Sequence, residues 1–132
     1  RMGMREALHA MLHTWPEGVR PKVHFSSPRT ELRQVARKDR KTGKSVTVNM
    51  APVWTGHADF VNPFEFTAFM RTAAGLEFDV MLEAKSKDLA LIRLRPDLLR
   101  YAPDVAERFG LVPALQERLD AEEASLMDTE AA

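Results

Sequence analysis

The sequence predicts an α/β fold with parallel strands. Two short strand candidates, residues 21–25 and 78–83, alternate with helix candidates along the chain. Strands separated by a helical segment are typical of βαβ units, in which both strands run in the same direction. Because two strands cannot bury both faces of such a sheet, we interpret the chain as the end of a larger α/β fold.

The first two elements follow from local sequence patterns. Helix-forming residues with apolar side chains at helical spacing predict a helix over residues 4–12. In the strand that follows, Val23 and Phe25 point to one face, and Lys22 and His24 point to the other. A polar pair on a short buried strand is unusual, because a buried charge is costly unless it is paired or metal-bound.

The later elements are marked by caps and breakers. The pair Asn62-Pro63 opens a helix over residues 64–74, which Gly75 ends. After the strand at 78–83 we expect a helix over residues 88–94, with Pro96 either limiting it or starting a further turn, and two short helices between 103 and 126. Within the stretch 29–56, a turn at 42–44 and a strand at 45–48 indicate a mobile hairpin. Trp15, Trp54 and the phenylalanines at 64, 66 and 69 are expected to pack in the protein.

Charge is distributed unevenly in a chain of zero formal net charge. Residues 29–56 carry seven basic and two acidic side chains, whereas residues from 113 to the end carry six acids and one arginine. Such asymmetry suggests a basic surface and an acidic tail. The chain has no cysteine, no long apolar run and no secretory signal, which predicts a cytoplasmic protein without a membrane partner. It begins with Arg1, which suggests a cut or incomplete chain.

Polar side chains capable of metal binding follow the two predicted strands. Lys22 and His24 lie at the end of the first, His57 lies in the loop after it, and Glu83 closes the second. In parallel α/β folds functional groups gather at the carboxyl ends of strands. Imidazole and carboxylate together suit divalent metals such as Mn, Zn or Fe.

Three segments resemble the last three motifs of the UV damage endonucleases. They are residues 21–28 (PKVHFSSP), 57–61 (HADFV) and 79–88 (DVMLEAKSKD), in the same order and strand contexts. The resemblance covers residues 12–100. It implies the C-terminal part of a (β/α)8 TIM barrel related to the metal-dependent apurinic endonucleases. Residues 1–111 would supply its last βα units, with 29–56 as a basic insertion and 112–132 as an acidic helical tail.

The resemblance also implies a cluster of divalent metals, with manganese expected and other divalent metals open. His24, His57 and Glu83 would be ligands, and Lys22, which can be carboxylated in this family, would join the site; Lys22 and Glu83 would be catalytic. The alternatives without a metal are a hydrogen-bonded structural His24, an exposed His57, and an ion pair between Glu83 and Lys85 or Lys87. Lys85 and Lys87 could also form only a solvated start of the next helix. Asp59 is open between supporting His57 and simple exposure, and Ser26 and Ser27 are open between binding phosphate and capping a turn. The family's ligands on earlier strands have no counterpart here.

The implied function is a DNA repair endonuclease that nicks double-stranded DNA on the 5′ side of UV lesions, active as a monomer when complete. Basic side chains would contact DNA phosphates; they are Arg29, Arg33, Arg37, Lys38, Arg40, Lys41, Lys85 and Lys87. One alternative is an inactive barrel fragment or a binding module. Another is a metal-dependent sugar isomerase built on the same type of barrel.

Overall fold

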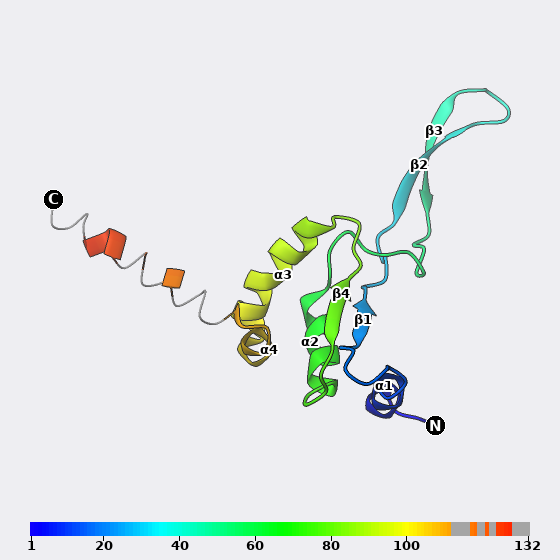
Figure 1. Ribbon diagram of the computed structural model, residues 1–132. Coiled ribbons are helices and arrows are strands. Elements are labelled where there is room, and N and C mark those ends of the chain that lie inside the picture. The colour runs from blue at the N-terminus through cyan, green and yellow to red at the C-terminus, as the bar shows by residue number, and fades with distance from the viewer. Residues whose placement is uncertain (112–116, 119–120, 122–123, 128–132) are drawn as a thin grey trace.

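The computed structural model describes residues 1–111, 117–118, 121 and 124–127. Its elements form a small helical body and a long hairpin that projects from it (Figure 1). In chain order they are α1 Met4–Leu12, β1 Lys22–Phe25, β2 Arg33–Lys38, β3 Ser45–Met50, α2 Pro63–Thr72, β4 Asp79–Leu82, α3 Asp88–Tyr101 and α4 Pro103–Arg108. Among the described residues, no helix has both the length and the apolar character needed to cross a membrane.

The predicted parallel pairing is confirmed. β1 and β4 run side by side, with Lys22 opposite Asp79 and Phe25 opposite Leu82, and α2 lies between them in sequence. Because side chains alternate along a strand, the pair has two different faces. Val23, Phe25, Val80 and Leu82 pack against the core. The opposite face carries Lys22, His24, Asp79 and Met81, and Met81 is 43% exposed.

The core lies between this sheet and the helices. Its buried members include Phe66 and Met70 of α2 and Leu94 and Leu98 of α3. The ring of Phe66 meets that of Phe25 edge to face at 5.2 Å, which ties α2 to β1.

The expectation that these five aromatic residues pack is confirmed for Phe66, which is 2% exposed, and for Phe69, which packs against the core. It is wrong for Trp54, which is 67% exposed. Phe64 is 63% exposed but its ring lies 5.4 Å from that of Tyr101, and Trp15 is 36% exposed.

Helix α2 begins where the sequence predicts and is held at both ends. The Asn62 side chain accepts hydrogen bonds from the backbone N–H groups of Phe64 and Glu65, which caps the first turn. At the other end, Arg5 donates to the carbonyls of Thr72 and Ala74, and Arg108 donates to those of Met70 and Ala73. The last carbonyls of a helix lack partners within it, so these two arginines satisfy them from α1 and α4.

Helix α3 is longer than predicted. It continues through Pro96 to Tyr101, so the expected stop is wrong. An interior proline costs a helix about 3 kcal/mol because it removes a hydrogen bond and clashes with the preceding turn. Burial of a leucine side chain stabilises by about 1.5–3 kcal/mol. Leu98 is 3% exposed and Leu99 packs against the core, so their burial offsets the cost of Pro96.

The predicted hairpin is present, and its first strand was missed. β2 pairs antiparallel with β3, with Arg33 opposite Met50 and Lys38 opposite Ser45. The sequence of β2, RQVARK, has little apolar content to indicate a strand. Of the two helices predicted between 103 and 126, α4 is the first, and the region of the second lies mostly outside the described residues. The same holds for the acidic tail at 112–132.

Candidate metal centre

Three chain segments meet at the carboxyl ends of β1 and β4. The backbone N–H of Glu83 donates to the carbonyl of Phe25 at 2.8 Å. The N–H of Ala58 donates to the carbonyl of Ser27 at 2.9 Å, and that of Lys85 donates to the carbonyl of Ala58 at 3.0 Å. These bonds fix the segment that carries His57 between the residues that follow the two strands.

The side chains of His24, His57 and Glu83 converge at this edge. Nδ1 of His24 lies 2.5 Å from Oε1 of Glu83, a hydrogen bond in which the ring nitrogen is the donor. Nε2 of His57 lies 3.5 Å from Oε2 of the same carboxylate. Both oxygens of Glu83 therefore face an imidazole, as expected if the three residues form one site. The side chains are 58%, 45% and 38% exposed for His24, His57 and Glu83, so the cluster is open to ligands.

The surroundings of Glu83 favour its ionised form. The hydrogen bond from His24 lowers the pKa of the Glu83 carboxyl below its usual value. Partial burial raises that pKa and so opposes the shift, while the charges of His24 and His57 lower it further. The Glu83 carboxylate is therefore ready to act as an anionic ligand near neutral pH.

Lys22 shares the polar face of the sheet with this cluster, but lies at the opposite end of its strand from the position predicted. It is the first residue of β1, two residues before His24, and its Cα partner across the sheet is Asp79. Asp79 binds Arg20 through a 2.6 Å contact between Nε and Oδ1. Within the described chain, Lys22 makes no recorded hydrogen bond or ion pair, and its amine is exposed on the face that carries His24.

A hollow of about 530 Å³ adjoins the cluster. His57 and Glu83 line one part of it, and Lys85, Lys87 and Asp88 line another. Lys87 precedes the first turn of α3 and has a φ of 52°, a left-handed conformation that is uncommon for a residue with a side chain. Such conformations are concentrated at functional sites, because the surrounding structure must hold them in place. Among the described residues, neither lysine forms an ion pair with Glu83. The alternative that Glu83 pairs with Lys85 or Lys87 therefore finds no support.

Several other candidates have structural partners. Asp59 lies 3.6 Å from Arg29 through Oδ1 and Nη2, so the contact recorded for it is with Arg29 rather than His57. Arg29, 19% exposed, also lies 3.8 Å from Glu31. Among the basic residues of the hairpin, Arg33 is half-buried and the others are exposed. Ser27 is buried, and its hydroxyl accepts a hydrogen bond from the N–H of Asn62 at 2.9 Å. This bond supports the capping alternative for Ser27.

The donor set suits a divalent metal but is incomplete. Two imidazoles and a carboxylate are ligands that manganese, zinc and iron accept. In the part of the chain that the structure describes, however, no three histidine, cysteine, aspartate or glutamate side chains are already arranged as a metal-binding group. Glu83 is instead engaged by both imidazoles, so a metal would replace these contacts and would need further ligands.

Comparison with known proteins decides the family. The family model described as UV-endonuclease UvdE matches residues 1–108. The chain belongs to this family. The UV DNA damage endonuclease of Bacillus cereus strain G9842 is 32% identical over 98 residues, which cover 72% of this chain and 25% of the relative. That of Bacillus mycoides strain KBAB4 is 30% identical over 94 residues, which cover 69% of this chain and 23% of the relative.

The UV-endonuclease match includes every residue of the cluster and the whole hairpin. The chain spans about a quarter of the length of the curated relatives it matches. No solved structure matches it.

Proposed function

We propose that this chain forms the C-terminal part of an endonuclease that nicks double-stranded DNA on the 5′ side of UV lesions. The observation that carries the proposal is the convergence of His24, His57 and Glu83 at one edge of a parallel sheet, in a member of the UV-endonuclease family. A divalent metal cluster, with manganese as the expected metal, would share its ligands between these residues and earlier strands.

The architecture we propose for the complete protein is a (β/α)8 barrel. The parallel pair of β1 and β4, with α2 between them and α3 after them, is the connection that such a barrel repeats. Within the described residues each of these strands pairs with one neighbour only, which leaves an edge on each side for further strands. Their polar face would then point into the barrel, and the cluster would lie at its catalytic end.

Each residue of the cluster has a part in the proposed reaction. His24, His57 and Glu83 would hold metal, and the carboxylate would supply negative charge to balance it. A bound divalent metal polarises the scissile phosphate, activates a water molecule and stabilises the leaving oxygen. Lys85 and Lys87, on the rim of the same hollow, would bind DNA phosphates as point charges.

Lys22 would join the site if it is carboxylated. A neutralised and carboxylated amine becomes an anionic oxygen ligand. Lys22 is exposed on the face shared with His24, with no hydrogen bond or ion pair to any residue that the structure describes. An unmodified Lys22 would instead contribute a positive charge near the bound phosphate. The carboxyl group on the lysine amine is lost when a proteolytic peptide is acidified for mass spectrometry. The modification is therefore best sought as electron density in a crystal of the complete enzyme.

The test uses the complete endonuclease that contains this chain and a UV-irradiated supercoiled plasmid. We expect manganese-dependent nicking by the parent protein. Glu83→Gln should reduce nicking by at least about 100-fold, because substitutions that merely disturb the partners of ligands already cost 10–100-fold. Metal content, measured by mass spectrometry, should fall in the same variant. Glu107→Gln, an exposed change on α4, is the matched control. Parental nicking by Glu83→Gln would reject the assignment.

A further inference from the structure

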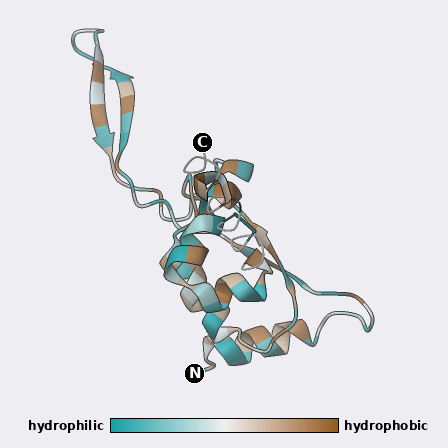
Figure 2. Cartoon of the chain, turned by 90° about the vertical axis from the view of Figure 1, so that its left-hand side faces the viewer, coloured by the Kyte–Doolittle hydropathy of each residue, from teal (hydrophilic) through white to brown (hydrophobic). Residues whose placement is uncertain are grey.

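The β2–β3 hairpin has two chemically different faces. The pairing register places Arg33, Val35, Arg37, Val46, Val48 and Met50 on one face. The other face carries Gln34, Ala36, Lys38, Ser45, Thr47 and Asn49, so five of its six side chains can form hydrogen bonds. The alternation of hydrophilic and hydrophobic bands along the two strands is visible in Figure 2.

The tip of the hairpin presents concentrated positive charge. Between Arg33 and Met50 there are six basic residues and one acid, a net charge of +5 (six minus one). The one acid is Asp39, and its carboxylate accepts hydrogen bonds from the backbone N–H groups of Lys41 at 2.7 Å and Thr42 at 3.4 Å. Gly43, with a φ of 68°, completes the turn. Asp39 thus shapes the turn, while Arg40, Lys41 and Lys44 are exposed.

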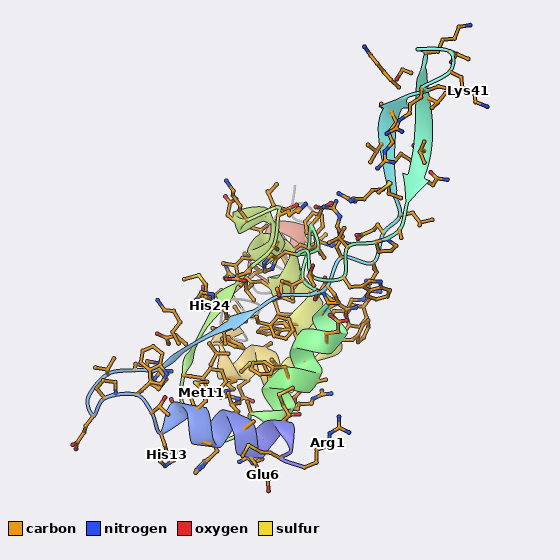
Figure 3. All side chains as sticks on the ribbon, turned by 90° about the vertical axis from the view of Figure 1, so that its right-hand side faces the viewer. Arg1, Glu6, Met11, His13, His24 and Lys41 are labelled. Carbon is orange, nitrogen blue, oxygen red and sulfur yellow. The ribbon has the colours of Figure 1, made fainter. Side chains whose placement is uncertain are left out.

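Both ends of the hairpin are attached to the metal-binding edge. The segment that leaves β1 and the segment that returns to His57 are joined by a bridge between Pro28 and His57. The N–H of Arg29 also donates to the carbonyl of Gly56 at 2.8 Å. From this base the strands project away from the body, and Lys41 lies at the far end from His24 (Figure 3). DNA bound at His24 and His57 would therefore have the hairpin beside its flank.

We propose that this hairpin is a DNA arm that lies in the major groove of the duplex beside the nick, with its polar face toward the bases. The inference rests on the proposed function, because that function supplies the duplex. A two-stranded ribbon fits the major groove, about 12 Å wide, and is too broad for the minor groove, about 6 Å wide. Gln, Asn, Thr and Lys side chains hydrogen-bond to base edges and phosphates, whereas four of the six side chains of the other face, three valines and Met50, cannot. Arg33 and Arg37, the two basic residues of that face, would contact phosphates.

The length of the arm sets how far it reaches. Six residues in each strand, at about 3.3 Å per residue, span roughly 20 Å. Base pairs rise by about 3.4 Å each, so the arm covers about six base pairs. Arg40, Lys41 and Lys44 at the tip would contact the phosphates at the far end, in a manner that does not depend on sequence.

Two measurements on the complete endonuclease test the arm without requiring cleavage. The first is protection of guanine N7, an atom in the major groove, from dimethyl sulfate on a duplex with one lesion. We expect protected guanines within about six base pairs on one side of the nick position. Gln34→Ala with Thr47→Ala and Asn49→Ala should remove this protection. The control Val46→Thr with Val48→Thr, on the opposite face, should keep it.

The second measurement is the salt dependence of binding to undamaged duplex. Arg40→Ser with Lys41→Ser and Lys44→Ser should reduce the slope of log K against log salt by about 2.7, roughly 0.9 for each lost phosphate contact. The proposal of a DNA arm is overturned by any one of three results. They are unchanged guanine protection in the polar-face variant, equal loss of protection in the valine control, and an unchanged salt slope in the variant of the tip. Nicking by excess enzyme at low salt is measured in a separate assay. If the protein nicks DNA but fails the two tests above, the DNA arm is rejected and the proposed function stands. A parent that never nicks refutes the proposed function.

Discussion

The two strand pairs of this molecule are held together in opposite ways. β1 and β4 are separated by more than fifty residues, run parallel, and pack the partly buried Phe25 and Val80 against the core. β2 and β3 are joined by a six-residue turn and run antiparallel, with Val46 and Val48 exposed. Tertiary burial fixes the first pair, whereas the second depends on local turn chemistry around Asp39 and Gly43.

The parallel pair can hold side chains at fixed positions, whereas the hairpin can carry side chains far from the body. The parallel pair is anchored by the core, so it can hold His24 and Glu83 at a fixed separation. The hairpin is anchored only at its base and extends charged side chains away from the body (Figure 1). A site that must position metal ligands needs the first kind of support, and a surface that follows a DNA backbone can use the second.

The largest predicted effect concerns the purified 132-residue chain. Among the residues that the structure describes, the parallel pair has an unpaired edge on each strand, and Met81 on its polar face is 43% exposed. We expect no cooperative melting transition and no metal-dependent nicking of irradiated plasmid, because a two-stranded pair lacks the cover that a larger sheet provides. Circular dichroism melting and a plasmid assay measure these two properties. A chain that melts cooperatively and nicks irradiated DNA would contradict the proposed dependence on further strands.

An intermediate effect should separate the core from the hairpin. Leu98→Ala in the complete protein should lower the free energy of unfolding by about 2–5 kcal/mol, because it removes a buried side chain and leaves a cavity. Val48→Ala should change it by no more than about 0.5 kcal/mol, because this side chain is 36% exposed and lies on the hairpin, outside the core. Urea denaturation followed by tryptophan fluorescence measures both. Equal losses would show that the hairpin is packed as firmly as the body.

The sequence was sufficient to predict the elements of the parallel pair and the helix between its strands. Alternation in residues 21–25, the Asn62 cap and the apolar run at 78–83 placed β1, α2 and β4, and so the edge where His24, His57 and Glu83 meet. These signals are local, and each agrees with the burial that the fold imposes. Whether the three residues bind metal, and whether the basic residues contact DNA, remain predictions.

The sequence was insufficient wherever distant contacts decide the structure. The end of α3 depends on burial of Leu98 beyond Pro96, which no local pattern contains. Partners such as Arg29 with Asp59 join residues about thirty positions apart. Strand β2 gave almost no apolar signal, because its pairing with β3 follows from the turn rather than from burial.

The smallest predicted effect is a pH dependence confined to the helical body. Arg71 of α2 binds Asp104 of α4 through two hydrogen bonds, of 2.9 and 3.0 Å. The hydrogen bonds and positive charge of Arg71 lower the pKa of the Asp104 carboxyl below its usual value, although partial burial opposes the shift. A lowered folded-state pKa contributes stability that is present above the unfolded-state pKa, about 3.9, and is lost as pH falls through the folded-state value.

Asp104→Asn should therefore lower the melting temperature of the complete protein slightly at pH 7. The difference from the parent should shrink below about pH 4, where the parent carboxylate also becomes protonated. The pair is exposed to solvent and weakened by salt, so the shift should be small and smaller still in high salt. Glu107→Gln on the same helix serves as the control for removal of a charge without this partner. A difference between Asp104→Asn and the parent that stays constant from pH 7 to pH 3 would show that the ion pair does not couple α2 to α4.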